Sequence, residues 1–265
     1  MGPLRVGLNS CARLEMMRIA VIGSGIAGMA AAYYLSRKHE VFVLEKEPRV
    51  GGHTHTVTVE SSRGPLAVQE DYRAFRGRYD KIVSIEMFEA VGLHYYDEFF
   101  RACDRLLRPD GTMLMQTITL NEQAFPAYHR RSDWIRKYIF PGAELASVSE
   151  ILRSLARVTS LGLYHAEDIG THYARTLAAW RKRFHAAAAA VRALGFDARF
   201  VRMWDYCLAY CEGAFLERHI GDFQLLLTKN HSPRQLFGEP WGGEGDRIDR
   251  ISHLAAQAVD TPASG

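Results

Sequence analysis

The strongest constraint on the fold lies in residues 18–45, where a glycine turn separates a short apolar run from an alanine-rich segment. Residues 18–22 are apolar and rich in β-branched side chains, which is typical of a buried strand. Residues 29–37 follow the turn and have the composition of a helix. Residues 40–44 form a second apolar run, which ends in Glu45. The order strand, turn, helix, strand predicts the first unit of a parallel sheet with helices on its faces.

The glycines in the turn, Gly23, Gly25 and Gly28, have the spacing of a dinucleotide-binding loop. Gly23 permits the tight turn, Gly25 lets the backbone approach a pyrophosphate, and Gly28 lets the helix pack closely on the strand. The free N–H groups at the helix N-terminus would face the phosphates. Glu45 stands where this fingerprint has an acid, so we expect it to accept hydrogen bonds from a ribose hydroxyl.

The residues after Glu45 indicate which dinucleotide is bound. Residues 46–56 read KEPRVGGHTHT, and this run resembles the arginine and glycine-pair motif that follows the second strand in flavin-dependent amine oxidases. The resemblance covers residues 17–68 and implies FAD as the cofactor, with Arg49 among the residues that bind it. His53 and His55 have strand-like spacing but no third ligand nearby, so we interpret them as loop or strand surface and predict no metal site.

From residue 69 onward a different alternation of strands and helices begins. An apolar strand at 82–85 is followed by the start of a helix, and residues 95–107 carry aromatic and apolar side chains at helical spacing. Residues 108–111 read RPDG, which predicts a turn, and residues 112–120 form the next apolar strand. We therefore expect an α/β fold: a Rossmann-like, doubly wound, mostly parallel sheet with a helical C-terminal part.

This second segment resembles the cyclopropane-fatty-acyl-phospholipid synthases, a family of S-adenosylmethionine-dependent methyltransferases. The resemblance is dense over residues 69–228 and includes the runs YDKIVSIEMFEAVG at 79–92, DWIRKYIFP at 133–141 and EDIGTHYARTLAAW at 167–180. It implies transfer of a methyl group from the sulfonium of S-adenosylmethionine to a double bond in an acyl chain of a membrane phospholipid. In the family a bicarbonate ion then accepts the proton that the carbocation loses as the ring closes.

The resemblance also implies roles for individual residues. Glu89, in the MFEAVG run, and Tyr173, in the THYARTL run, fall on the glutamate and the tyrosine that help to hold the bicarbonate. Gln116 falls on a strand position that often carries a histidine; its amide can hydrogen-bond an anion but cannot take a proton. Asp71 falls where the family contacts the adenine of the methyl donor. Nothing in the sequence corresponds to the cysteine of the family's site.

These motifs divide the chain into an N-terminal extension at 1–16, a flavin-type βαβ segment at 17–68, a methyltransferase-like portion at 69–228 and a loose tail at 229–265. The flavin-type unit stands where the synthases have their own donor-binding loop. Gly25 and Glu45 could still accept an adenosyl group, because both families bind ribose through an acid at this place. Three functions stay open: a cyclopropane synthase with impaired donor binding, an FAD-dependent oxidoreductase, and a non-catalytic fusion remnant.

Composition narrows the choice of partners. Hydrophobic residues make up 48% of the chain and charged residues 24%, ordinary values for a globular protein, and a formal charge of +3 does not indicate nucleic acid. The sequence has no apolar run of about 18 residues, so it predicts no transmembrane helix. The four cysteines, Cys11, Cys103, Cys207 and Cys211, form no CxxC pair, and we expect reduced core thiols in a cytoplasmic protein.

Residues 128–140 bear on a membrane partner, because they mix basic side chains with Trp134, Tyr138 and Phe140. A basic aromatic helix can lie on an anionic membrane surface, which suits a lipid enzyme that is peripheral at the inner membrane. The alternative is that the aromatic side chains face the core and the arginines face water. The sequence does not decide the acyl substrate or whether the chain forms a homo-oligomer.

Overall fold

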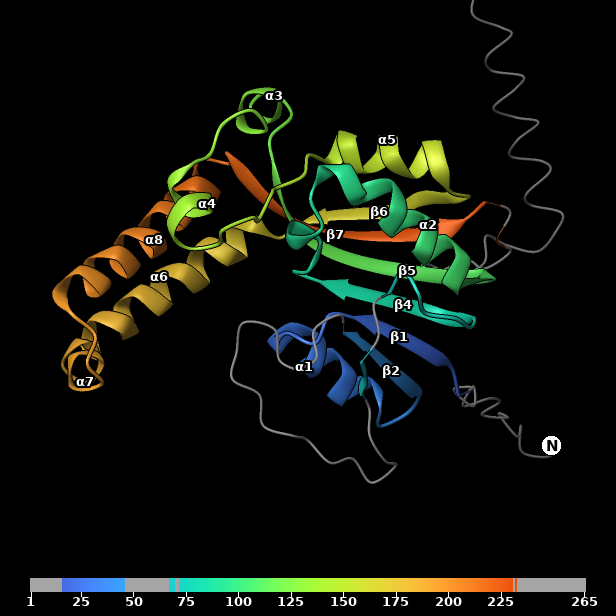
Figure 1. The fold of residues 1–265 in the computed structure, drawn as a ribbon, viewed down its shortest axis with the longest axis horizontal. Coiled ribbons are helices and arrows are strands. Elements are labelled where there is room, and N and C mark those ends of the chain that lie inside the picture. The colour runs from blue at the N-terminus through green and yellow to red at the C-terminus, as the bar shows by residue number, and fades with distance from the viewer. Residues whose placement is uncertain (1–15, 46–66, 70–71, 231, 233–265) are drawn as a thin grey trace, which may run out of the picture. The chain divides into compact units, whose positions relative to one another are not determined.

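A computed structural model describes residues 16–45, 67–69, 72–230 and 232. The elements in these residues belong to one compact unit that ends at Asn230. Within the described residues this unit contains a seven-stranded sheet in the order β3-β2-β1-β4-β5-β7-β6, with helices packed on it (Figure 1). The expected α/β class is confirmed.

The strands are β1 Arg18–Ile22, β2 Glu40–Glu45, β3 Ala67–Gln69, β4 Tyr79–Ile85, β5 Leu107–Leu120, β6 Leu161–Asp168 and β7 Ile220–Lys229. The ladders among β1 to β5 are parallel, and β7 runs antiparallel to both β5 and β6, so the sheet is mostly parallel as expected. The strand order reverses between β1 and β4. In open sheets of this kind, ligands bind outside the carboxyl ends of the strands at that reversal.

The helices are α1 Ile26–Leu35, α2 Tyr96–Leu106, α3 Phe125–Tyr128, α4 Trp134–Tyr138, α5 Val148–Val158, α6 Gly170–Ala186, α7 Ala188–Ala193 and α8 Ala198–Leu216, with 3-10 turns at Phe88–Ala90 and Leu93–Tyr95. Ala20 and Ile22 of β1 belong to the main core, which includes side chains of α2 and α5. Ile19 and Val21 belong to a second core that includes α1. Because successive side chains of a strand point to opposite faces, α1 covers the face opposite to α2 and α5.

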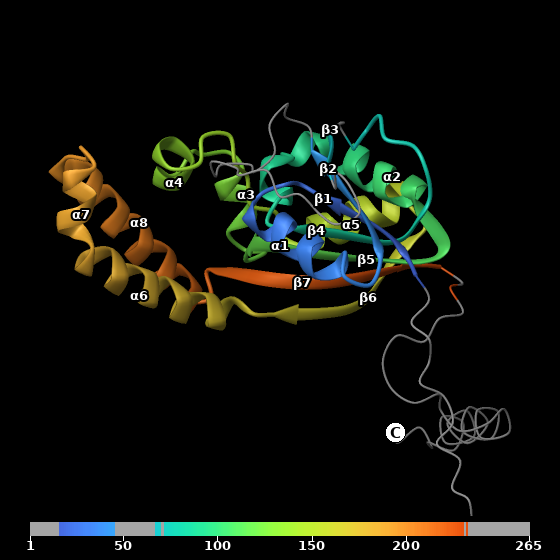
Figure 2. The same cartoon turned by 90° about the horizontal axis from the view of Figure 1, so that it is seen from below.

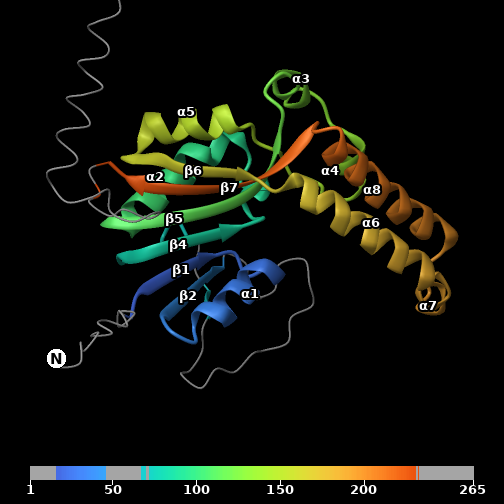
Figure 3. The ribbon, with the colours of Figure 1, turned by 180° about the vertical axis from the view of Figure 1, so that it is seen from behind.

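Helices α6 and α8 pack side by side and extend away from the strands (Figures 1 and 3). Figure 2 shows β6 leading into α6 and α8 returning to β7. Ala174 and Leu177 of α6 join Leu208 and Phe215 of α8 in a small core of their own. Helices α6 and α7 are separate, because the backbone leaves helical geometry at Ala187, with φ −92° and ψ 4°.

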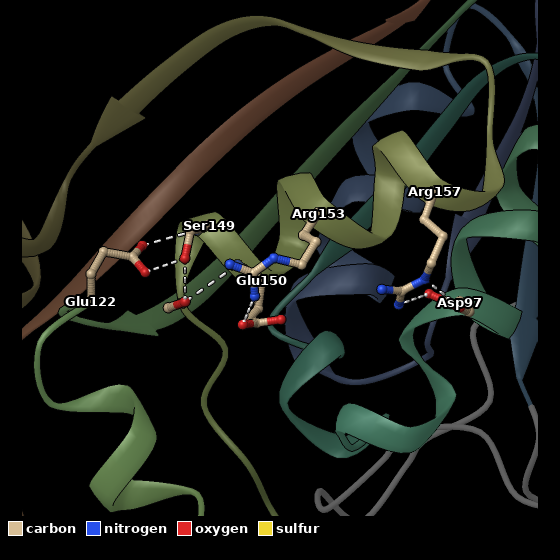
Figure 4. A network of polar contacts seen from close by, with 7 residues as sticks. Asp97, Glu122, Ser149, Glu150, Arg153 and Arg157 are labelled. Atoms are coloured by element: carbon tan, nitrogen blue, oxygen red, sulfur yellow. Dashed lines mark hydrogen bonds and ion pairs between the residues drawn. The ribbon is translucent and has the colours of Figure 1, made fainter.

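A polar network on the surface fixes α5 (Figure 4). Arg157 donates hydrogen bonds to both carboxylate oxygens of Asp97 on α2, at 3.0 and 2.6 Å. At the other end of α5, the Ser149 backbone N–H donates to Glu122 at 2.9 Å. The two-pronged contact of a guanidinium with a carboxylate constrains orientation as well as distance. The network therefore holds α5 against α2 on the sheet.

The prediction of a turn at residues 108–111 is wrong, because β5 continues through these residues. Tyr79 pairs with Leu107 and Lys81 pairs with Thr112, so five steps along β5 match two steps along β4. The surplus residues form an irregularity in the ladder of the kind that a β-bulge produces. The sequence RPDG therefore breaks the pairing register without ending the strand.

Candidate functional site

The glycine turn lies where β1 ends and α1 begins, and its glycines have the surroundings that their roles require. Gly23 has a φ of +90°, which L side chains rarely adopt. A Cβ on Gly28 would lie 2.0 Å from the Gly23 carbonyl oxygen, so this close approach needs glycine. Among the described residues, no atom lies within 4 Å of a Cβ built on Gly25. With respect to these residues, the loop therefore has open space at the N-terminus of α1.

Glu45 is buried at the end of β2 and is bonded to this loop. Its Oε2 accepts hydrogen bonds from the Ser24 backbone N–H at 3.0 Å and from the Ser24 hydroxyl at 2.5 Å. The carboxylate thus fixes the conformation of the glycine turn from the neighbouring strand. Its expected role toward a ribose hydroxyl stays a prediction.

The loop after β1 lies against the segment that follows β4. The atoms closest to a Cβ built on Gly23 are the Met87 Cγ at 3.0 Å and the Met87 Cβ at 3.3 Å. Met87 follows Glu86 directly and precedes Glu89 by two residues. The glycine loop and these two carboxyl groups therefore lie at one edge of the sheet, at the reversal of strand order.

Glu89 is held from β5. Its Oε1 accepts hydrogen bonds from the Thr117 hydroxyl at 2.7 Å and from the Ile118 backbone N–H at 2.6 Å. Its Oε2 is buried and has no hydrogen-bond partner among the described residues. Burial, and second the charge of Glu86, raise the pKa of Glu89 to about 7. The carboxyl can therefore both accept and donate a proton near neutral pH.

Gln116 joins two more carboxyl groups. Its Nε2 donates to Glu86 Oε1 at 3.1 Å and to Asp222 Oδ2 at 3.0 Å, and its Oε1 accepts from Gln224 at 2.9 Å. Asp222 is fully buried, and within the described part of the chain its Oδ1 has no partner. Burial raises the pKa of both carboxyls, and for Glu86 the charge of Asp222 raises it further. The pair therefore retains a proton well above the usual range for a carboxyl group.

Tyr173 lies in the first turn of α6, close to the groups just described. We call Glu86, Glu89, Gln116, Tyr173 and Asp222 the carboxyl cluster. The Tyr173 ring stacks on Phe215 of α8 with the centroids 5.0 Å apart. Burial raises the pKa of Tyr173, and the charges of Glu86, Asp222 and Glu89 raise it further. The phenol is thus within electrostatic reach of the three carboxyls and stays neutral, so that it can donate a hydrogen bond.

The structure brings two sets of predicted residues together: Glu89, Gln116 and Tyr173 in the carboxyl cluster, and Gly23, Gly25, Gly28 and Glu45 at the glycine turn. The other predicted residues of the site, Arg49 and Asp71, lie outside the described residues, as do His53 and His55. The proximity of these groups supports a shared site, while the chemical role of each residue stays a prediction.

Sequence reasoning missed Glu86 and Asp222. Glu86 follows β4 directly, at the strand end where α/β sheets carry functional side chains, and that position was the available signal. Its φ of +52° is rare for a residue other than glycine, and such strain is common at functional sites. Asp222 gave no local signal, because it is 106 residues from Gln116 and meets it only through the pairing of β7 with β5.

The protonation state of this cluster decides what it can bind. Protonated carboxyls and the Tyr173 hydroxyl can donate hydrogen bonds to a small anion. Ionised carboxylates repel an anion and instead stabilise positive charge at the edge of the sheet. The arrangement therefore suits a reaction in which a cation forms and a proton is removed.

A family model described as mycolic acid cyclopropane synthetase matches residues 49–225, which include the whole carboxyl cluster. The chain belongs to this family. The match starts 20 residues before the boundary expected at residue 69. A second model, an FAD binding domain, matches residues 18–58 and ends before the first residue of the cluster.

Curated relatives agree with the family. The tuberculostearic acid methyltransferase of Mycobacterium tuberculosis is 35% identical over 198 residues, which cover 69% of this chain and 46% of that protein. The cyclopropane-fatty-acyl-phospholipid synthase of Escherichia coli is 33% identical over 224 residues, which cover 83% of this chain and 56% of that protein. The chain thus spans about half the length of these curated relatives.

Solved structures agree with the fold. A mycolic acid cyclopropane synthase complexed with SAH and CTAB matches with a TM-score of 0.68 and 25% identity, covering 81% of this chain and 78% of that chain. The cyclopropane synthase MmaA2 of Mycobacterium tuberculosis matches with a TM-score of 0.66 and 24% identity, with the same coverage. Methyltransferase relatives and the SAH complex point to S-adenosylmethionine as the donor of the family.

The N-terminal βαβ unit is part of the same sheet. Residues 69–265 are 197 of the 265 residues, or 74% of the chain, so the 83% that matches the Escherichia coli synthase must include part of the N-terminal segment. In the structure, β1 pairs in parallel with β4 from Ile19 to Ile22. The flavin-like unit and the methyltransferase-like portion therefore form one continuous sheet.

Proposed function

We propose that this chain catalyses methyl transfer from S-adenosylmethionine to a double bond in an acyl chain of a membrane phospholipid. The observation that carries this proposal is the contact, at Gly23 and Met87, between the glycine turn and the segment that bears Glu86 and Glu89. This contact supports a methyl-donor site at the glycine turn, next to groups that could take up a proton. Family membership supports the type of reaction.

The glycine turn is the proposed donor site. Gly25 leaves open space there, and Glu45 holds the turn in shape through Ser24. When bound, S-adenosylmethionine supplies the electrophilic methyl group on a cationic sulfonium. Asp71 is the residue proposed to contact its adenine, by the resemblance to the synthases.

The carboxyl cluster is the proposed site of proton removal. Glu89, in its protonated form, and Tyr173 would hold a bicarbonate by hydrogen bonds. Gln116, whose two amide N–H groups donate to Glu86 and Asp222, would border that ion. Glu86 and Asp222 both accept hydrogen bonds from the Gln116 Nε2, and their raised pKa values mean that this pair retains a proton. The bicarbonate would take the proton that the carbocation loses and become carbonic acid, while the ionised carboxyl oxygens of the cluster would stabilise the cationic centre on the acyl chain.

The proposed place of action is a phospholipid surface. Within the described residues, no helix has the length and apolar character needed to cross a bilayer. We propose that the protein reaches its lipid substrate from the cytoplasmic side, as a peripheral protein of the inner membrane.

A transfer assay tests this function. The protein is incubated with S-adenosylmethionine carrying a labelled methyl group and with vesicles of dioleoylphosphatidylglycerol, and the lipid is extracted and weighed by mass spectrometry. We expect each product chain to gain one labelled CH₂, and Glu89→Gln to lower the rate by about a hundredfold or more, the range typical of a lost acid–base group. Glu122→Gln is the matched control, because Glu122 bonds Ser149 outside the site. Equal rates in wild type and Glu89→Gln would contradict the proposal.

The match to an FAD binding domain favours a second candidate, an FAD-dependent oxidoreductase that uses the same glycine turn. In this alternative Arg49 assists Gly23, Gly25 and Gly28. Purified protein that carries a stoichiometric yellow chromophore, together with absence of methyl transfer, would favour this candidate over the methyltransferase.

A further inference from the structure

Helices α4 and α8 border a groove of about 440 Å³. Its lining comprises Trp134, Tyr138, Arg199, Arg202, Met203 and Tyr206. Trp134 packs edge-on against Tyr206 with the ring centroids 4.6 Å apart, and Tyr138 is 48% exposed. Trp134 and Tyr138 of the basic segment at 128–140 therefore line a surface groove instead of entering the core of the sheet.

Two cationic side chains give the groove its charge. Arg199 and Arg202 are exposed, one turn apart on α8, and neither forms an ion pair within the part of the chain that is described. The nearby carboxylates are engaged elsewhere: Asp205 pairs with α6, and Asp197 and Asp133 cap α8 and α4. A pair of guanidinium groups beside aromatic rings suits a phosphate that carries an apolar group, because guanidinium binds phosphate oxygens two at a time.

One ridge of α8 connects this groove with the carboxyl cluster. Side chains four residues apart lie in a row on a helix, and this row contains Arg199, Met203, Cys207, Cys211 and Phe215. Phe215 stacks on Tyr173, so the row starts at a guanidinium and ends at the candidate site. Arg202 lies beside this row, one turn after Arg199. Arg202 and Phe215 are separated by about 20 Å along the helix axis at 1.5 Å per residue. An extended acyl chain reaches from the lipid phosphate to a mid-chain double bond over a comparable length.

We propose that the groove between α4 and α8 binds the phosphodiester of a glycerophospholipid at a bilayer surface. Arg199 and Arg202 hold the phosphate, and Trp134 and Tyr206 pack on the glycerol region, where amphipathic rings are favoured. Only the identification of this lipid as the substrate rests on the proposed methyl transfer; binding of the phosphodiester does not.

Tryptophan emission provides a test that needs no turnover. Dihexanoylphosphatidylglycerol, kept below its micelle concentration, is titrated into the whole protein, and Trp134→Phe shows which part of the signal comes from the groove. We expect the double variant Arg199→Gln/Arg202→Gln to raise the Kd about tenfold, the size of effect expected for lost hydrogen bonds from a charged group. The control Arg175→Gln/Arg192→Gln removes the same charge from exposed positions on α6 and α7 and should bind as wild type.

Three results would overturn the proposal: an unchanged Kd in the groove variant, an equal loss in the control variant, or an emission change that survives Trp134→Phe. Inorganic phosphate at the same concentration distinguishes a lipid site from a site for free phosphate, and equal affinity for both would also contradict it. Vesicles of dioleoylphosphatidylglycerol should lose binding to the same groove variant. A protein that binds lipid in this way but transfers no methyl group would refute the proposed function and leave the groove assignment standing.

Discussion

At the scale of single residues, Gln116 joins two neighbouring carboxyl groups, Glu86 and Asp222. Its amide donates to Glu86 and Asp222, which both hold protons above the usual carboxyl range. Gln116→Met keeps the length of the side chain and removes the donor. We expect the free energy of unfolding to fall by about 2 kcal/mol at pH 8.5, where carboxylates are left without a donor, and by much less at pH 5, where the pair is protonated. Urea unfolding at the two pH values measures both numbers.

Gln224→Met is the control for this prediction, because among the described residues the Gln224 amide donates to the Gln116 oxygen and not to a carboxylate. Gln224→Met should change the free energy of unfolding by the same amount at pH 5 and at pH 8.5. The wild-type protein itself should lose stability as pH rises from about 5 to 8, because in that range the native carboxyls bind more protons than the unfolded ones. A pH-independent loss in Gln116→Met would show that the amide serves packing alone.

The residues of the site were predictable to unequal degrees. Glu89 and Tyr173 lie in continuous runs that carry their own context, so the sequence suffices to propose them. The structure brings them near Gln116, and their roles stay predictions. Asp222 enters the site through long-range strand pairing, which no local pattern encodes. Glu86 was visible as an acid at a strand end, but the raised pKa that marks it depends on burial and on Asp222.

At the scale of elements, two glycines of the turn between β1 and α1 have different expected roles. Gly28 is needed for packing, and Gly25 is needed for ligand binding. Gly28→Ala would place a Cβ 2.0 Å from the Gly23 carbonyl oxygen, so we expect a loss of about 3 kcal/mol or more in the free energy of unfolding, since backbone must shift to relieve the overlap. Gly25→Ala meets no atom and has φ −61°, so it should cost under about 1 kcal/mol as a changed N-cap. Denaturant unfolding and titration with S-adenosylmethionine distinguish the two.

The expected contrast is a destabilised Gly28→Ala and a stable Gly25→Ala whose affinity for S-adenosylmethionine is reduced, because the added methyl group occupies the open space beside the loop. Unchanged affinity for S-adenosylmethionine in Gly25→Ala would place the donor site elsewhere.

Elements with strong local signals, such as β1, β2 and α2, were predicted well. The continuation of β5 through RPDG was not, because pairing with β4 outweighs the local preference for a turn.

At the scale of the whole molecule, the question is whether two segments with different resemblances fold as one unit. Ala20, Ile22 and Leu44 from the N-terminal unit are buried in the same core as Ile82, Met113 and Leu225. The β1–β4 ladder crosses the boundary between the segments as well. A shared core of this kind unfolds cooperatively, so the two segments should melt together.

A thermal melt of the whole protein tests this unity and identifies the cofactor at the same time. We expect one transition, and a midpoint raised by about 5–10 °C when S-adenosylmethionine is present at a hundred times its Kd, because a ligand that binds only the native state stabilises it by mass action. FAD at the same concentration should leave the midpoint unchanged, and Gly25→Ala should reduce the shift caused by S-adenosylmethionine. Two separate transitions would show that the N-terminal unit folds apart from the rest, whereas a shift caused by FAD alone would assign the glycine turn to the oxidoreductase alternative.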